Sequence, residues 1–191
     1  MAIILASKSP RRKELLSQMG LTFSISVADI DEYMESSIPV CDAVGDLSCR
    51  KAMAVPCGKE DVVIAADTVV VIDGEVLGKP HTEEEAKKML RRLSSRTHEV
   101  MTGVTVRDES HAETFTEITK VTFRDLSENE ISAYVKTGDP MDKAGSYGVQ
   151  GKAGMFVSAL EGDYFNVMGL PICRLSRVLR HFHVEVLGEK G

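Results

Sequence analysis

The residue in this chain that most clearly suggests chemistry is Asp67, a single carboxylate within a long apolar run. Residues 62–72 read Val-Val-Ile-Ala-Ala-Asp-Thr-Val-Val-Val-Ile, which is typical of a strand buried on both faces in an α/β protein. A buried carboxylate is costly unless a cation or a metal pairs with it. Asp67 is therefore a candidate functional residue. A strand that ends at Ala66, with Asp67-Thr68 as a polar kink before a second strand, also explains the pattern, and ligands of α/β sheets gather at strand ends.

A group of cations near the N-terminus suggests a phosphate site. Arg11 and Arg12 follow Ser7-Lys8-Ser9-Pro10 and fall in the first turn of a predicted helix, where the helix dipole favours anions and disfavours cations. Ser7, the two arginines and the free helix N–H groups together suit phosphate oxygens. As an alternative, exposed arginines in a first turn cost only roughly a few tenths of a kcal/mol. The segment is not a P-loop, because G-x-x-x-x-G-K-[ST] is absent.

Further candidates lie in other segments. Lys51 shares a helical face with Leu47, four residues earlier, so it either extends along apolar surface or points inward at an anion. Glu32 belongs to an acidic loop at residues 29–32, which is either solvated or helps to hold a divalent cation. Lys79 follows a short predicted strand.

A glycine-rich irregular segment at residues 139–154 contains Gln150. Glycine at this density allows backbone to approach a ligand closely. The alternative is a flexible surface loop, but residues such as Tyr147 and Val149 are not typical of one.

Other chemistries lack their signatures. The five histidines give no Ser-His-Asp pattern, and the metalloprotease and dinucleotide-binding fingerprints are missing. The four cysteines form no C-x-x-C pair, so a zinc site is not expected. Cations for phosphates and carboxylates for Mg²⁺ remain, which are the components that phosphate chemistry requires.

The elements that must position these side chains follow from periodicity and capping. The first strand covers 3–6, and the first helix runs from Arg11 to about Met19, with Ser9 as N-cap, Pro10 at its first position and Gly20 after it. Further helices are predicted at 42–54, from the capping box Thr82–Glu85 to 93, at 127–137, and from Pro171 to 182. Strands are predicted at 23–27, 62–72, 75–80, 97–106 and 114–124, with a hairpin made by 155–160 and 164–168.

The totals set limits on the protein class. With 191 residues and a net charge of -6, we expect a single domain that covers 1–191, with a frayed tail at 183–191. The acidic balance argues against general nucleic-acid binding. No stretch approaches ~18 apolar residues, so no membrane span is expected, and the N-terminus lacks the basic region of a signal peptide. A cytoplasmic location is the resulting expectation.

Six motifs in the same order resemble the Maf family. They are Ala6-Ser7-Lys8-Ser9-Pro10-Arg11-Arg12, Asp31-Glu32, Lys51-Ala52, Ala66-Asp67-Thr68, Gly78-Lys79-Pro80 and Gly145-Ser146-Tyr147-Gly148-Val149-Gln150-Gly151. The resemblance covers residues 3 to 182, and no motif position departs from the family pattern. It implies an α/β fold with an elongated, twisted mixed sheet flanked by helices, in two lobes with a central cleft, similar to the inosine triphosphate pyrophosphatases.

The resemblance also implies an activity. Maf proteins are cytoplasmic nucleoside triphosphate pyrophosphatases that use a divalent metal, here expected to be Mg²⁺ or Mn²⁺. Many form homodimers, and the family is linked to arrest of septum formation. Carried over by position, the functional residues are Ser7, Arg11, Arg12, Glu32, Lys51, Asp67, Lys79 and Gln150, with Asp67 as proton acceptor. Arg11, Thr68 and Gln150 match the branch that acts on dTTP and UTP.

Chemical roles for these residues can be stated independently of the family. Ser7, Arg11 and Arg12 would hold phosphate oxygens, and Lys51 and Lys79 would neutralise charge as the α–β bond breaks. Glu32 and Asp67 would bind the metal, with Asp67 acting on the attacking water. Thr68 and Gln150 could contact the pyrimidine edge, since an amide is both donor and acceptor. Two alternatives are a low-turnover nucleotide-binding regulator of septum formation and a phosphohydrolase that removes only the γ-phosphate.

Overall fold

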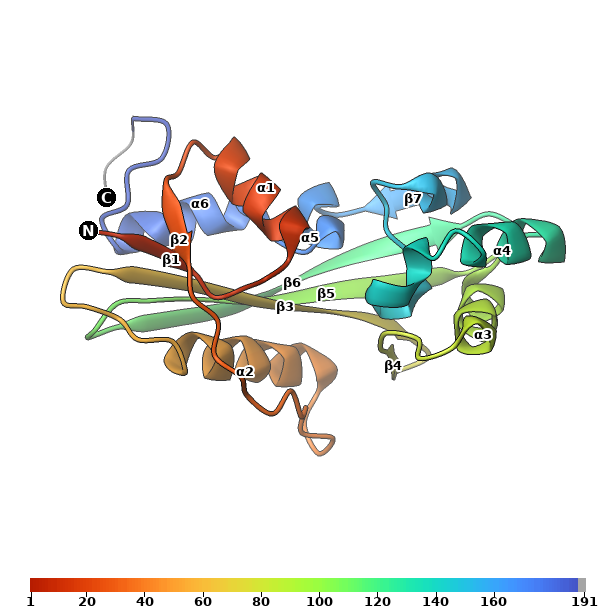
Figure 1. Ribbon diagram of the computed structural model, residues 1–191, viewed down its shortest axis with the longest axis horizontal. Coiled ribbons are helices and arrows are strands. Elements are labelled where there is room, and N and C mark those ends of the chain that lie inside the picture. The colour runs from red at the N-terminus through yellow and green to blue at the C-terminus, as the bar shows by residue number, and fades with distance from the viewer. Residues whose placement is uncertain (189–191) are drawn as a thin grey trace. The chain divides into compact units, whose positions relative to one another are not determined.

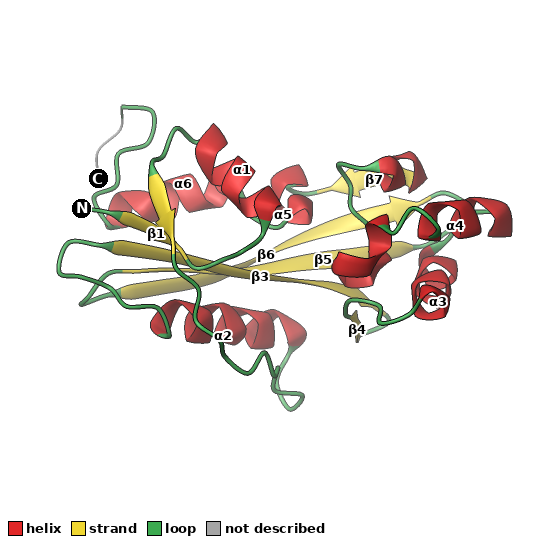
Figure 2. Cartoon of the chain, in the orientation of Figure 1, coloured by secondary structure: helices red, strands yellow, loops and turns green. Residues whose placement is uncertain are grey.

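The structure is a computed structural model, and it describes residues 1–188. Seven strands form one mixed sheet in the order β2-β1-β3-β5-β6-β7, with β4 paired to β3 (Figures 1 and 2). The strands are β1 Ile3–Leu5, β2 Phe23–Ile25, β3 Val62–Ile72, β4 Glu75–Leu77, β5 Thr97–Arg107, β6 Ala112–Phe123 and β7 Val157–Glu161. The α-helices are α1 Pro10–Gln18, α2 Val40–Met53, α3 Glu83–Leu93, α4 Glu128–Val135, α5 Tyr164–Met168 and α6 Ile172–His181. Three short 3-10 helices are η1 Asp139–Asp142, η2 Ala144–Ser146 and η3 Lys152–Phe156.

The chain divides into two compact units. The first unit combines Met1–Asp67, Thr102–Glu117 and Gly169–Gly191. In it, β1 pairs in parallel with both β2 and β3, while α2 lies on one face of the strands and α1 and α6 lie on the other (Figure 1). Parallel strands covered on both faces are expected to be apolar throughout, and Val62 to Ala66 are all buried.

Helix α2 approaches strand β5 very closely, and the reason is a glycine. A Cβ atom built on Gly103 would lie 2.3 Å from the carbonyl oxygen of Val44 in α2. Beside this contact, the buried Ser48 hydroxyl lies 2.8 Å from that of Thr105, which lies 2.8 Å from that of Thr114. Backbone contact and this chain of hydroxyl hydrogen bonds together determine where α2 sits on the sheet.

The second unit comprises Thr68–Met101 and Ile118–Met168. Its core gathers apolar residues of α3, α4 and the strands around an aromatic group in which the Phe123 ring meets Tyr147, Phe156 and His98 edge-on. The predicted Asp73-Gly74 hairpin between β3 and β4 is confirmed, with both turn residues at positive φ.

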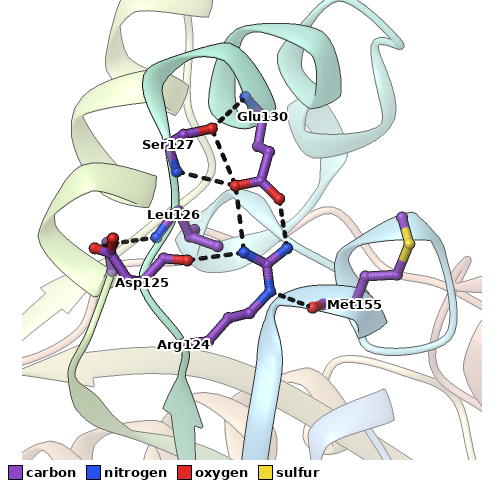
Figure 3. A network of polar contacts seen from close by, with 7 residues as sticks. Arg124, Asp125, Leu126, Ser127, Glu130 and Met155 are labelled. Carbon is purple, nitrogen blue, oxygen red and sulfur yellow. Dashed lines mark hydrogen bonds and ion pairs between the residues drawn. The ribbon is translucent and has the colours of Figure 1, made fainter.

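A polar network closes the end of β6 in this unit (Figure 3). The Arg124 guanidinium donates to Glu130 Oε1 at 2.6 Å, to the Asp125 carbonyl oxygen at 2.8 Å and to the Met155 carbonyl oxygen at 2.9 Å. Glu130 also accepts the Ser127 N–H at 3.0 Å, and its own N–H donates to Ser127 Oγ at 3.3 Å. The predicted capping box at Ser127 is therefore present and is extended to η3 by the arginine.

Two predictions about elements are corrected. Residues 164–168 form helix α5 rather than a strand, because Asp163 Oδ1 accepts the N–H groups of Phe165 and Asn166 and so caps a helix. The tail is not frayed from residue 183, since Val184 and Val186 are buried. The remainder of that predicted tail, residues 189–191, lies outside the described residues.

The predicted α/β class, a mixed sheet flanked by helices, is confirmed. The single domain that covers 1–191 and the central cleft stay predictions. Among the described residues, no helix has the length and apolar character to span a membrane.

Candidate active site

Lys51 joins the two carboxylates that the sequence singles out. Its Nζ lies 2.5 Å from Asp67 Oδ1 and 2.9 Å from Glu32 Oε1. The Lys51 and Asp67 side chains are only 15% and 16% exposed, whereas Glu32 is 65% exposed. Lys51 therefore points inward from α2 at an ion pair, and the alternative of a lysine extended along apolar surface is wrong.

Asp67 lies in the middle of a continuous strand. Strand β3 runs from Val62 to Ile72 without interruption, so the alternative of a strand that ends at Ala66 is also wrong. The residues before Asp67 are buried, while Asp67 and Thr68 are partly exposed. The strand thus holds the carboxylate rigidly where solvent or a ligand can reach it.

Ser7 and Arg12 meet at the start of helix α1. The helix begins at Pro10 after Ser9, as predicted. Arg12 Nη1 donates to Ser7 Oγ at 3.3 Å, and the Ser9 N–H donates to the same oxygen at 3.2 Å. The segment after β1 is therefore folded tightly around the Ser7 hydroxyl, with helix N–H groups beside it.

Arg12 also contacts the backbone of a distant segment. Its Nε donates to the carbonyl oxygen of Gly169 at 2.8 Å, and Gly169 has a φ of 113°. No residue pattern indicates this partner, because a backbone carbonyl carries no residue-type signature. Arg12 is expected to hold phosphate oxygens, but its bond to Gly169 shows that it also holds this segment.

The electrostatics place Arg12 in the same neighbourhood as the carboxylates. Burial lowers the pKa of the Arg12 guanidinium from its ordinary value. Asp67 and Glu32 act to raise that pKa, and Arg11 acts to lower it. The first unit thus brings three kinds of group into one site. They are the cations Arg11, Arg12 and Lys51, the carboxylates Glu32 and Asp67, and the Ser7 hydroxyl.

The remaining predicted residues belong to the second unit. Lys79 and Gln150 are exposed, and Thr68 is partly exposed. The Gly145 N–H donates to the Gly78 carbonyl oxygen at 3.0 Å, so the backbone just before Lys79 is joined to the glycine-rich segment that carries Gln150. Within this unit, two of the predicted motifs are therefore in direct contact.

The donor set can be tested for a metal. Two carboxylates, Glu32 and Asp67, converge on one cationic atom, Lys51 Nζ. Within residues 1–188, no group of three or more His, Cys, Asp and Glu is arranged to hold an ion. One or two carboxylates fit Mg²⁺, which keeps waters and binds substrate phosphates as its other ligands.

The comparison with protein families decides the identity. The family model described as "Maf-like protein" matches residues 2–182. The chain belongs to the Maf family. Among curated relatives of this Maf chain, the "dTTP/UTP pyrophosphatase" of Bacillus cereus strain AH820 is 49% identical over 185 residues, covering 96% of this chain and 97% of the relative. The protein of the same name from Bacillus pumilus strain SAFR-032 is 49% identical over 183 residues, covering 95% and 97%.

Solved structures share the fold of this Maf chain at low sequence identity. A HAM1 protein from Coxiella burnetii has a TM-score of 0.56 and 17% identity, covering 95% of this chain and all of that chain. The Ham1 protein of Staphylococcus aureus has a TM-score of 0.55 and 15% identity, covering 95% and 99%. These similarities support the predicted fold class.

Proposed function

We propose that this Maf protein hydrolyses nucleoside triphosphates, most readily dTTP and UTP, to the nucleoside monophosphate and pyrophosphate. The observation that carries the proposal is the partly buried cluster in which Lys51 bridges Asp67 and Glu32, close to Arg12. Curated relatives at 49% identity are named for this activity. Their match extends over 96% and 95% of this chain.

The reaction requires water to attack the α-phosphorus while the bond to the bridging oxygen breaks and pyrophosphate leaves. Asp67 would orient this water and accept its proton. Ser7, Arg11 and Arg12 would hold phosphate oxygens beside the helix N-terminus. Lys51 and Lys79 would stabilise the charge that develops on the leaving pyrophosphate.

We expect a divalent cation, Mg²⁺ or Mn²⁺, to be bound by Glu32 and Asp67. When bound, it would polarise phosphate oxygens and neutralise their charge. Both carboxylates converge on one cationic atom, Lys51 Nζ, so these two side chains are close enough to hold one cation together. The ammonium of Lys51 would then be shared with the phosphates.

Base selectivity would come from Gln150 and Thr68. Gln150 is exposed, three residues after the buried Tyr147, so its amide is available to a ligand. An amide offers both a donor and an acceptor, which complements the N3–H and O4 groups of uracil or thymine. Cytosine presents the reversed pattern, an N3 acceptor and an N4–H₂ donor, so CTP should be used less well if the amide is held in one orientation. Purine triphosphates differ in size and edge and should also be used less well.

Product analysis with a panel of triphosphates and Mg²⁺ tests the proposal. We expect pyrophosphate and monophosphate from dTTP and UTP, with lower kcat/KM for CTP, ITP and 7-methyl-GTP. Orthophosphate and a nucleoside diphosphate would instead identify an enzyme that removes the γ-phosphate. Tight nucleotide binding without turnover would favour the regulator of septum formation.

Three further properties follow from the family resemblance and stay predictions. They are a cytoplasmic location, assembly as a homodimer and a link to arrest of cell division. None of them is needed for the chemistry proposed above.

A further inference from the structure

A buried hydrogen bond connects strand β5 to the glycine-rich segment of the second unit. His98 Nε2 lies 2.7 Å from the Tyr147 hydroxyl oxygen, and the two residues are only 2% and 5% exposed. Burial lowers the pKa of His98 to about 4 and raises the pKa of Tyr147. Both groups are therefore neutral at pH 7, and the bond joins an uncharged imidazole to a phenol in the core.

Tyr147 belongs to a group of three consecutive buried residues. Gly145, Ser146 and Tyr147 are buried, while Gln150 is exposed. Gly145 and Ser146 both adopt positive φ, at 65° and 64°, which is unfavourable for a serine and persists only where packing enforces it. The segment thus has a rigid buried base and an exposed end that carries the amide.

The buried base is held by several contacts that leave little space. A Cβ on Gly145 would lie 2.8 Å from a methyl group of Val70, and Ser146 Oγ donates to the Met89 sulfur at 3.0 Å. The Tyr147 ring packs edge-on against His98 and Phe123. Of all these contacts, the hydrogen bond to His98 is the directional one on the Tyr147 ring.

His98 carries an energetic cost that an apolar residue at the same position would avoid. Within the part of the chain that the structure describes, its Nδ1 is buried without a hydrogen-bond partner. A leucine or phenylalanine would fill the same core without that desolvation penalty. A polar residue in this place is explained if its single hydrogen bond to Tyr147 serves the position of the glycine-rich segment.

We propose that His98 and Tyr147 are positioning residues that fix the Gly145–Gln150 segment, so that the Gln150 amide meets the pyrimidine edge in one orientation. The inference rests on the proposed function, and it concerns specificity rather than bond cleavage. Neither residue is assigned contact with the nucleotide. They would act on Gln150 indirectly, because the buried residues Gly145, Ser146 and Tyr147 are joined to Gln150 by only two residues.

Tyr147→Phe tests the proposal because it removes one hydroxyl and keeps the ring. We expect the ratio of kcat/KM for UTP to kcat/KM for CTP to fall by about tenfold. This is smaller than the ~10²-fold loss of rate that a displacement of about 1 Å can cause. The loss should appear as a raised KM for UTP with kcat little changed. Tyr164→Phe, which removes the same atom from an exposed tyrosine in α5, should leave the ratio unaltered.

Two variants of His98 separate positioning from stability. His98→Gln keeps a hydrogen-bonding group directed at the Tyr147 hydroxyl and should retain most of the selectivity. The double variant His98→Leu with Tyr147→Phe replaces both partners by apolar groups, so stability should recover while selectivity stays low. Amide hydrogen exchange at residues 148–151 should be faster in Tyr147→Phe and in the double variant than in the wild type.

The outcomes distinguish failure of this inference from failure of the proposed function. A wild-type enzyme that does not discriminate UTP from CTP contradicts the pyrimidine-edge proposal itself. A wild-type preference that survives in Tyr147→Phe and in the double variant overturns the positioning role. Faster exchange with unchanged selectivity would also overturn it, because the bond would then only stabilise the fold.

Discussion

At the residue scale, the pairing of Asp67 with Lys51 explains how a carboxylate persists within an apolar strand. The sequence predicts that a cation or a metal must pair with this charge, and Lys51 Nζ does so at 2.5 Å. The choice of lysine was not predictable, because it depends on where α2 sits against the sheet. That position is set by Gly103 and the Ser48–Thr105 hydrogen bond, whose roles no local pattern indicates.

The two arginines of helix α1 are expected to differ in how much they contribute to stability. Arg12 is partly buried and donates to the Gly169 carbonyl oxygen, so Arg12→Ala should lower the free energy of unfolding by about 1–3 kcal/mol. It should also weaken triphosphate binding. Arg11→Ala should raise KM for dTTP with a smaller change in Tm. Thermal melts and steady-state kinetics on both variants check this, and equal Tm losses with unchanged KM would contradict it.

At the element scale, capping rules predicted the helices well and apolar runs predicted strands less well. Helix α3 begins where Thr82 Oγ1 accepts the Glu85 N–H at 3.1 Å, and α4 begins with the expected capping box. Residues 164–168 are a short, mainly apolar run, Tyr-Phe-Asn-Val-Met, whose period cannot distinguish helix from strand. The Asp163 carboxylate accepts the Phe165 N–H and caps a helix there, which the periodicity alone does not indicate.

Gly103 provides a prediction about how α2 is placed. In Gly103→Ala the new Cβ would overlap the Val44 carbonyl oxygen at 2.3 Å, so α2 must move and Lys51 with it. We expect a lower Tm and a loss of pyrophosphate release of about 10²-fold, as for a displaced catalytic group. Gly45→Ala is the graded control, because its Cβ would meet Thr116 Oγ1 at a milder 3.3 Å. Near-native activity and Tm in Gly103→Ala would refute this role.

The network around Arg124 gives a pH dependence of stability. Hydrogen bonds from Arg124, followed by those from Ser127, lower the pKa of Glu130 from 4.5 to about 2. The folded state therefore favours the carboxylate, so this contribution is fully present above pH 4.5 and is lost as the pH falls towards 2.

The variant Glu130→Gln isolates this contribution. The difference in Tm between wild type and Glu130→Gln should be largest near neutral pH and should vanish towards pH 2. Glu83→Gln, in the first turn of α3, controls for the general helix-dipole effect. A Tm difference that is independent of pH would show that the carboxylate charge is not what stabilises this end of β6.

At the scale of the whole molecule, the sequence predicted the α/β class but not how the chain is divided into two units. The first unit is assembled from three separate segments, and strand β3 contributes residues to both units. Composition and turn signals mark no boundary at Asp67 or Thr68, because an unbroken strand runs through both. Long-range contacts such as that of Arg12 with Gly169 are likewise absent from any local pattern.

We propose that the Asp67 carboxylate carries the chemistry of pyrophosphate release. Its charge is paired with Lys51, so Asp67→Asn removes one partner of an ion pair, and we expect a small loss of stability. The direct measurement is pyrophosphate release from dTTP by Asp67→Asn across a Mg²⁺ titration, with dTTP binding measured in parallel.

We expect kcat to fall by at least about 10²-fold, while dTTP still binds through the residues around Arg11 and Arg12. Partial recovery at high Mg²⁺ would assign Asp67 to the metal, and no recovery would assign it to the attacking water. Near-native kcat in Asp67→Asn at saturating Mg²⁺ would show that Asp67 does not carry the chemistry.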